Sequence, residues 1–331
     1  MKAIVYDQYG PADNLDLRDV ADPECGPQDL LIEVHAAAIN PVDWKIRAGY
    51  QRAINPQRFP ARTGMDVSGV VLEVGSAVSG FSVGDAVFSS PSHKRLGTLA
   101  ERIAVRADEC ALKPPRLTHI EAASFPLVGL TAWDCLSWAQ VEAGERLMVE
   151  AAAGGVGSIA TQLGVAMGAE VAGTCSPKNT EFVASLGAIP IDYRSQRWSE
   201  VLPPQDVVLD SLGPVSASAA LAAVALGGRV ASINAGVVPA TTKYGPWLGT
   251  LAVAGGLVRL SVGARMAGKR FKSVLRQASG ANLAVLAEHL EAGRVVAQVG
   301  RVLPLAEAAE AHRLGEAGAV RGKIVLQVRE D

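Results

Sequence analysis

The feature that most constrains the fold of this chain is a run of small residues at 152–157, Ala-Ala-Gly-Gly-Val-Gly. It follows a strand-like run at 146–150 and precedes a helix expected at about 158–167. At such a junction, free backbone N–H groups and the positive end of the helix dipole stabilise a pyrophosphate, and larger side chains would block its approach. The run therefore predicts a dinucleotide-binding turn, with these candidate contacts: Ala153, Gly154, Gly155, Val156 and Gly157.

The surroundings of this turn predict two kinds of architecture within the 331 residues, a length that favours two domains. Strand-like and helical runs alternate between about 125 and 278, which indicates a parallel, doubly wound sheet. Residues 1 to about 124 instead contain short strand-like runs separated by turn signals, as in a barrel or sandwich. The last segment is mixed, with helices expected at 282–291 and 305–314 and a strand at 324–328.

The end of the second strand of the alternating region discriminates between the two nicotinamide dinucleotides. An NAD site usually places an acidic residue there to bind the ribose 2′-hydroxyl. Here the strand ends Thr-Cys-Ser-Pro-Lys-Asn at 174–179, without an acid. Ser176 can donate to a 2′-phosphate and Lys178 can neutralise it, while Tyr193 and Arg194 follow the next short strand. The pattern predicts NADPH, although Lys178 is also readable as an ordinary solvated lysine.

Composition excludes several other classes of partner. The net charge is −2, and no basic block indicates binding to nucleic acid or to an anionic membrane. The N-terminal residues do not form a signal peptide, and the apolar stretch 248–260 is too short to span a bilayer and carries Arg259. The four cysteines are scattered, without the spacing of a zinc lobe or a disulfide framework. A cytoplasmic protein with a small-molecule substrate and no membrane or nucleic-acid partner is expected.

The order of the motifs resembles the medium-chain dehydrogenase/reductase superfamily, in its zinc-free quinone oxidoreductase branch. The matching stretches are 38–43, 64–71, 129–133, the glycine turn, 186–188 with 191–193, and 321–325. The resemblance implies an α/β protein with a GroES-like β-barrel catalytic domain (1–124 and 279–331), a Rossmann NADPH-binding domain (125–278) and a cleft between them. It also implies a homodimer, paired through the strand-like run at 271–275.

The resemblance also bears on metal binding. Zinc-dependent relatives hold catalytic zinc with Cys, His and Cys, and the corresponding residues here are Asn40, Met65 and Leu127, which are not a usable ligand set. Without a Lewis acid a simple ketone is hard to reduce, whereas a conjugated acceptor spreads the developing charge onto oxygen, so that neutral donors suffice. The expectation is a zinc-independent, NADPH-dependent reductase of a quinone or α,β-unsaturated carbonyl.

The candidate catalytic residues are Asn40, Asp43 and Tyr50 in the first domain and Thr131 in the second. Asn40 is the first candidate donor, and its alternative role is to cap the loop before Pro41. Asp43 is either catalytic or orders the same loop. Tyr50 is a candidate acid or substrate contact, although Gln51, and not Tyr50, stands at the position where relatives often carry a tyrosine.

For the cofactor, the resemblance implies three further contacts. It places Thr131 beside the nicotinamide ring, Asn234 near the carboxamide, and Lys323, in the 321–325 motif, among the binding residues. Residues 235–268 either line the substrate cleft or form a surface excursion. Two functional alternatives stay open: an enoyl-thioester reductase in polyketide, fatty-acid or other tailoring metabolism, and an NADPH-binding protein with little catalysis.

Overall fold

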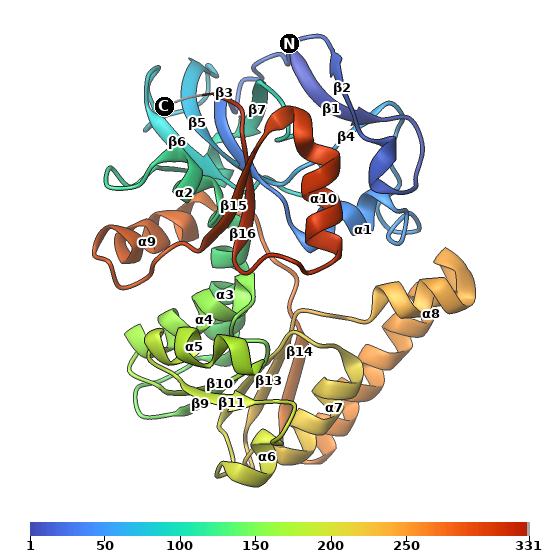
Figure 1. Cartoon of the computed structure of the whole chain (residues 1–331), viewed down its shortest axis with the longest axis vertical. Helices are drawn as coiled ribbons and strands as arrows, with labels where there is room; N and C mark the ends of the chain where they lie inside the picture. Colours follow the sequence, from blue (N-terminus) through green and yellow to red (C-terminus); the bar gives the residue numbers. More distant parts are fainter. Residues whose placement is uncertain (330–331) are drawn as a thin grey trace. The chain divides into compact units, whose positions relative to one another are not determined.

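The computed structural model describes residues 1–329, which form two units (Figure 1). Unit 1 contains Met1–Leu130, Gln277–Gly293 and the described chain from Ala297 onward. Unit 2 contains Thr131–Arg276 and Arg294–Val296. Unit 1 is therefore built from both ends of the chain, and unit 2 from the middle.

Unit 1 is organised around a seven-stranded sheet with the order β15-β16-β3-β5-β6-β8, in which β7 also pairs with β3. Its strands are β3 (Asp29–Ala38), β5 (Asp66–Val74), β6 (Ala86–Ser89), β7 (Arg102–Arg106), β8 (Cys110–Leu112), β15 (Val299–Pro304) and β16 (Lys323–Gln327). A smaller sheet has the order β2-β1-β4, from β1 (Lys2–Tyr6), β2 (Asp16–Asp19) and β4 (Ala61–Arg62). The α-helices are α1 (Pro41–Arg47), α2 (His119–Ala123), α9 (Gly280–Glu291) and α10 (Ala308–Glu316).

The long strand β3 supplies the centre of the unit 1 core. Leu30, Ile32 and Val34 alternate along it and are all fully buried, as expected because successive side chains of a strand point to opposite faces. β16 pairs antiparallel with β3, with Val325 opposite Ala38. The C-terminal segment thus completes a sheet that the N-terminal segment begins.

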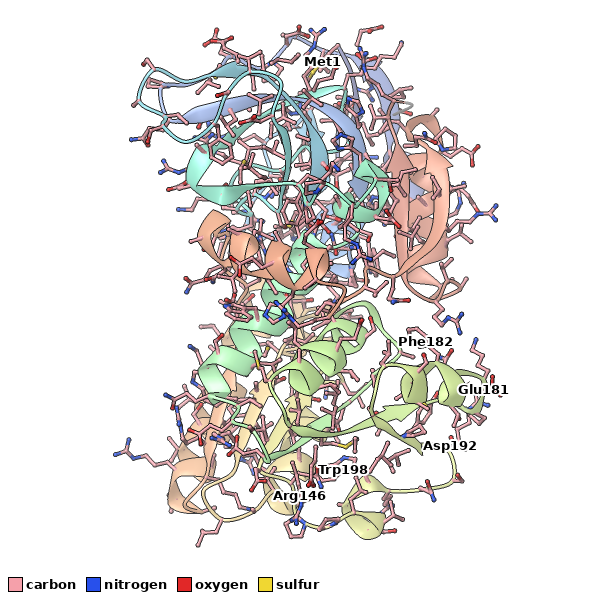
Figure 2. All side chains as sticks on the ribbon, turned by 90° about the vertical axis from the view of Figure 1, so that its left-hand side faces the viewer. Met1, Arg146, Glu181, Phe182, Asp192 and Trp198 are labelled. Carbon is pink, nitrogen blue, oxygen red and sulfur yellow. The ribbon has the colours of Figure 1, made fainter. Side chains whose placement is uncertain are left out.

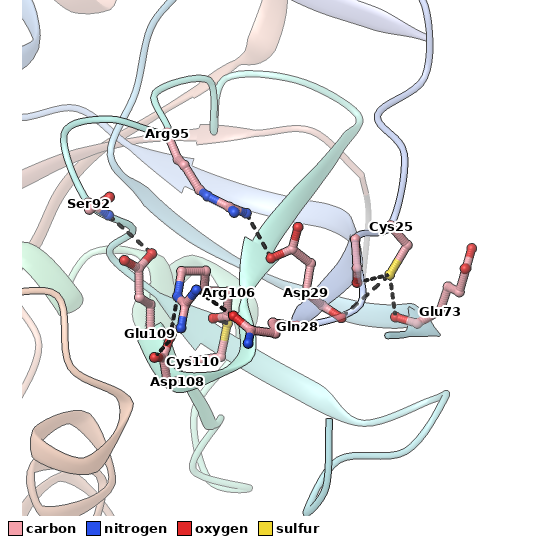
Figure 3. A network of polar contacts seen from close by, with 11 residues as sticks. Cys25, Gln28, Asp29, Glu73, Ser92, Arg95, Arg106, Asp108, Glu109 and Cys110 are labelled. Atoms are coloured by element: carbon pink, nitrogen blue, oxygen red, sulfur yellow. Dashed lines mark hydrogen bonds and ion pairs between the residues drawn. The ribbon is translucent and has the colours of Figure 1, made fainter. Parts of the chain in front are cut away.

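A polar network ties the start of β3 to β7 and β8 (Figure 3). Arg95 forms an ion pair with Asp29 at 2.8 Å, and Arg106 forms one with Asp108 at 2.7 Å. Cys110 donates from Sγ to the Arg106 carbonyl at 3.4 Å, and its burial raises the pKa of its thiol to about 12. A thiol with so high a pKa is structural, because the reactive form is the thiolate.

Unit 2 contains a parallel six-stranded sheet with the order β11-β10-β9-β12-β13-β14. Its strands are β9 (Arg146–Val149), β10 (Glu170–Cys175), β11 (Ile189–Asp192), β12 (Val207–Asp210), β13 (Arg229–Ser232) and β14 (Arg270–Ser273). Its helices are α3 (Pro126–Ala139), within which unit 2 begins, α4 (Gly155–Ala166), α5 (Thr180–Ser185), α6 (Trp198–Val201), α7 (Pro214–Ala223) and α8 (Val237–Met266). Because the first strand lies inside the sheet and the strand order reverses beside it, this is the doubly wound Rossmann topology that the sequence predicts.

Helix α8 is the element that departs most from the sequence-based expectation. The apolar run at 248–260 belongs to a helix of 30 residues, kinked where Gly245 (φ 76°) precedes Pro246. The run lies in the helical segment after the kink, and a further helical segment, from Val237, precedes the kink. Among residues 1–329, α8 is the one helix long and apolar enough to cross a membrane, judged by length and composition alone.

Candidate functional site

The glycine turn follows β9, from which Glu150 and Ala151 separate it, and its last residues form the start of helix α4. Ala151 has a left-handed backbone (φ 55°), which is uncommon outside glycine. Its N–H donates to Thr174 Oγ1 at 2.9 Å, and the Ala152 N–H donates to the Thr174 carbonyl, also at 2.9 Å. Thr174, near the end of β10, therefore fastens the turn to the neighbouring strand.

The geometry of this turn fits a diphosphate. A Cβ at Gly157 would lie 2.2 Å from the Ala151 carbonyl oxygen, and one at Gly154 would lie 3.2 Å from it. The first intrahelical hydrogen bond of α4 runs from the Ser158 N–H to the Gly154 carbonyl at 2.9 Å. The preceding N–H groups, of residues 155–157, consequently have no intrahelical acceptor and are suited to bind phosphate oxygens.

The residues predicted to bind a 2′-phosphate lie at the carboxyl ends of β10 and β11. Ser176 is buried, and its Oγ accepts from Asn179 Nδ2 at 3.2 Å. Lys178 is exposed, and within residues 1–329 no ion pair engages its ammonium group. Tyr193 is exposed, and its backbone N–H donates to the Cys175 carbonyl at 3.3 Å. The structure thus brings these residues to one edge of the sheet; their contact with a cofactor stays a prediction.

A carboxylate reaches the same edge from the neighbouring strand. Asp192 is the register partner of Cys175 across the β10–β11 pair (Asp192 is labelled in Figure 2). Its Oδ1 accepts from the Arg194 N–H and its Oδ2 from Ser195 Oγ, both at 3.0 Å. The carboxylate therefore caps the turn that follows β11. The spacing of residues along β10 does not reveal Asp192, because the register between β10 and β11 places its carboxylate at this edge of the sheet.

Two buried carboxyl groups, which were not predicted from the sequence, lie at the ends of the adjacent strands β9 and β12: Glu150 follows β9, and Asp210 is the last residue of β12. Glu150 accepts from Trp198 Nε1 at 3.2 Å and from Ser216 Oγ at 2.6 Å. Asp210 accepts from Ser232 Oγ at 2.5 Å. Burial, together with the adjacent Asp210, raises the pKa of Glu150 to about 7. In the sequence, the signal that could have indicated these two residues is an acidic residue at the end of each of two strand-like apolar runs.

The two predicted nicotinamide contacts also lie in unit 2. Thr131 is buried in α3. Asn234 donates from Nδ2 to the Leu212 carbonyl at 3.2 Å and accepts from the Gly236 N–H at 3.1 Å. It therefore joins the loops that follow β12 and β13. The proximity of either residue to a nicotinamide ring stays a prediction.

In unit 1, Asn40 and Asp43 together form the beginning of α1. Asn40 is the N-cap, Pro41 occupies the first turn, and the Asn40 N–H donates to Asp43 Oδ2 at 2.7 Å. Both residues therefore order the start of α1, and their catalytic roles stay predictions. Asp43 is 1% exposed, and its Oδ1 has no hydrogen-bond partner within the described chain. Burial raises the pKa of Asp43 to about 7, against the opposing effects of the Asn40 N–H and the Lys323 charge.

A buried ion pair holds the side chain of Asn40. Asp66 Oδ2 accepts from Asn40 Nδ2 at 2.8 Å and from Lys323 Nζ at 3.2 Å, while Asp66 Oδ1 accepts from the Leu127 N–H at 2.8 Å. Lys323 also donates to Asn40 Oδ1 and, at 2.8 Å, to the Ile39 carbonyl. The ammonium group of Lys323 is therefore engaged inside unit 1, and a cofactor contact by Lys323 stays a prediction. Asp66 had no role assigned from the sequence.

The remaining predicted residues concern the proton donor and zinc. Tyr50 is half-buried in the turn after α1, where its N–H donates to the Lys45 carbonyl at 3.0 Å; within residues 1–329 no hydrogen bond joins it to Asn40 or Asp66. Met65, at a zinc-ligand position of relatives, is buried. In the described part of the chain, no group of three or more His, Cys, Asp or Glu side chains is arranged to hold a metal ion.

Known proteins resemble this chain over both units. Residues 26–115 match the family described as "Alcohol dehydrogenase GroES-like domain", and residues 186–326 match "Zinc-binding dehydrogenase". The mitochondrial NAD(P)H oxidoreductase RTN4IP1 of Bos taurus is 33% identical over 99% of this chain and 89% of its own length. The chloroplastic NADPH-dependent alkenal/one oxidoreductase of Arabidopsis thaliana is 39% identical over 74% of this chain and 65% of its own length.

A solved structure gives the same result for the fold. The quinone oxidoreductase from Coxiella burnetii superimposes with a TM-score of 0.87 at 31% identity, covering 99% of both chains. The names of the two relatives above place them in mitochondria and chloroplasts, so the cytoplasmic location of this chain stays a prediction. The GroES-like domain and the Rossmann sheet that the sequence predicts are confirmed. The chain therefore belongs to the medium-chain dehydrogenase/reductase superfamily, in its quinone oxidoreductase-like branch.

Proposed function

We propose that this chain, an NAD(P)H-dependent oxidoreductase of the quinone and alkenal reductase type, uses NADPH in preference to NADH and reduces small quinones or α,β-unsaturated carbonyl compounds without zinc. The proposed preference for NADPH rests on the residues that follow the end of β10. There Ser176 and the exposed Lys178 stand where an NAD site has an acid. Asp192, the carboxylate from β11, is engaged by Arg194 and Ser195.

The acceptor class follows from the residues at the three zinc-ligand positions. Asn40, Met65 and Leu127 cannot form a zinc site, so the acceptor must accommodate negative charge with neutral donors. A conjugated carbonyl or a quinone does so, because charge delocalises onto its oxygen. The bound dinucleotide would supply the hydride to the conjugated carbon.

The residues of unit 1 have chemically distinct candidate roles. An asparagine amide has two N–H donors, and that of Asn40 gives one to Asp66; the other is our candidate donor to the acceptor oxygen. Asp43 carries a pKa of about 7, which suits a group that returns a proton near neutral pH. Tyr50 is the alternative proton source.

The cofactor proposal is tested by kcat/KM for NADPH and for NADH in the wild-type protein and in Ser176→Ala and Lys178→Ala. Loss of one hydrogen bond or ion pair to a phosphate should lower kcat/KM for NADPH about tenfold and leave NADH unchanged. Arg197→Ala is the matched control, because Arg197 is an exposed cation of unit 2 that pairs with Glu200. A wild-type preference for NADH contradicts the proposal.

A panel of acceptors tests the reaction class. A quinone, an alkenal and an enoyl thioester are each assayed by loss of NADPH absorbance. The proposal expects turnover of the quinone or the alkenal. Turnover of the thioester alone would replace it with the enoyl-thioester reductase alternative. Tight NADPH binding without turnover of any acceptor would leave an NADPH-binding protein with little catalysis.

The homodimer implied by the resemblance remains a proposal. β14 is an end strand of the six-stranded sheet, with β13 on one side, and an unpaired strand edge is a ready template for pairing with a second copy. Sedimentation velocity of the wild-type protein tests it, and a monomer at micromolar concentration would contradict it.

A further inference from the structure

We propose that helix α8 binds the surface of an anionic lipid bilayer through its outer stripe, lying in the plane of the interface. The outer stripe is the exposed apolar face formed by Trp247, Leu248, Leu251, Val258, Val262 and Met266. The proposal departs from the expectation, based on net charge and the length of one apolar run, that the chain has no membrane partner. It does not depend on the identity of the acceptor.

The outer stripe is apolar and unpartnered within residues 1–329. Trp247 is 69% exposed, Leu251 67% and Met266 84%. These residues are separated by one, three, seven, four and four positions, and at the 3.6-residue period of a helix all of them lie along one face. Single exposed apolar residues are ordinary, but a continuous row along a helix marks an interaction surface.

The opposite face of α8 anchors the helix to unit 2. Leu257, Leu260 and Ala264 pack with the hydrophobic core that also contains Phe271 of β14. Figure 1 shows α8 along the outside of unit 2, beside α7 and β14. Insertion of α8 across a bilayer would remove these residues from the core. The geometry is therefore that of an interfacial helix, with one face in the protein and the other toward lipid.

The charge around the stripe selects an anionic surface. Between residues 211 and 287 the chain has no Asp or Glu and eight Lys or Arg, although the whole chain has a net charge of −2. Lys243, Arg259 and Arg265 of α8 are exposed, and in the described chain none of them forms an ion pair. Long cationic side chains can rest on the apolar surface while their charges reach lipid phosphates.

A second copy of the chain fits the same stripe less well. In a two-fold symmetric contact the same patch meets itself. Paired outer stripes would therefore bring the cations of α8 close to their own copies, with no acidic residue between 211 and 287 to compensate them. An anionic bilayer has complementary charge and accepts the Trp247 ring at its interface.

The test is flotation of the full chain with vesicles. One set contains equal amounts of phosphatidylglycerol and phosphatidylcholine, and the other contains phosphatidylcholine alone. The proposal expects binding to the anionic vesicles only, weakening as salt concentration rises. The triple variant K243Q/R259Q/R265Q should bind about 100-fold more weakly, from the usual contribution of each cation near an anionic membrane. W247S/L251S should bind at least about tenfold more weakly.

Matched controls separate the outer stripe from general charge and hydrophobicity. K94Q/R197Q/R301Q removes the same charge from exposed positions outside α8, and V215S/L226S removes two exposed apolar side chains of unit 2; both should bind as the wild type does. Equal binding to both vesicle types, or wild-type binding by the α8 triple variant, overturns the proposal. So does a W247S/L251S variant that sediments as a smaller species while its vesicle binding is unchanged, since the stripe would then contact a second copy.

Discussion

The buried ion pair between Asp66 and Lys323 leads to a prediction about the stability of unit 1. Lys323→Met keeps most of the side-chain volume and removes the ammonium group. The fully buried Asp66 carboxylate would then retain hydrogen bonds from Asn40 and from the Leu127 N–H, without a compensating charge. Loss of one partner of a buried pair costs about 3–5 kcal/mol, so the free energy of unfolding should fall by that amount.

The double variant Asp66→Asn/Lys323→Met tests the cause of this loss. It removes both charges and keeps a hydrogen-bonding amide at position 66. Replacement of a complete buried pair by uncharged groups is close to neutral in other proteins. The double variant should therefore recover most of the stability that Lys323→Met loses, leaving a deficit of about 1–2 kcal/mol for imperfect hydrogen bonds.

Urea unfolding measures the free energies, and hydrogen exchange at β5 and β16 locates the loss in unit 1. The Kd for NADPH is measured in parallel. A loss below about 1 kcal/mol in Lys323→Met, or a double variant less stable than either single one, would refute the charge argument. If Lys323→Met instead raises the Kd for NADPH and leaves the free energy of unfolding unchanged, Lys323 contacts the cofactor, as the resemblance implies.

Three further predictions concern the turn and the buried acids. Gly157→Ala should raise the Kd for NADPH at least about tenfold, because its Cβ would meet the Ala151 carbonyl at 2.2 Å; an unchanged Kd in a fluorescence titration contradicts this. Since the folded-state pKa of Glu150 is raised to about 7, the folded protein binds more protons than the unfolded chain from about pH 4.5 to pH 7. Glu150 therefore makes stability fall as pH rises through that window, and urea unfolding of Glu150→Gln should show a shallower slope; an unchanged slope refutes the assignment. With Asp43 as the proton source, kcat falls as pH rises through about 7, and a falling limb that persists in Asp43→Asn excludes that role.

Much of unit 2 is predictable because its structure depends on local patterns. The strand-like runs predicted at 170–174 and 229–233 correspond to β10 and β13, whose central residues are apolar and buried, as expected for strands covered on both faces of a parallel sheet. The glycine turn lies between β9 and α4, where its backbone N–H groups indicate an anion site. The length of α8 was not predictable from apolarity alone, because a second helical segment, from Val237, adjoins the apolar run across the kink at Gly245 and Pro246.

The polar site of unit 1 depends on contacts that are remote in sequence. Lys323 and Asp66 are 257 residues apart, and neither the barrel strands nor their spacing indicates that β16 pairs with β3. The sequence does predict both possible roles of Asn40, because an asparagine before Pro41 is a recognisable helix start. Asp192 was missed for the related reason that parallel register, not chain order, places it beside Cys175.

The discontinuity of unit 1 has a consequence for the order in which a ribosome can complete this protein. β3 and β5 are among the early strands to emerge, but β16, which pairs with β3 and supplies Lys323, emerges last. All six strands of the unit 2 sheet have been synthesised by Ser273. Nascent chains generally fold from the N-terminal domain onward. Here unit 1 cannot complete its sheet, and Asp66 lacks its ionic partner Lys323, until the residues of unit 2 have been synthesised and can fold. A chain truncated before β15 should accordingly retain a folded nucleotide domain and lose the barrel.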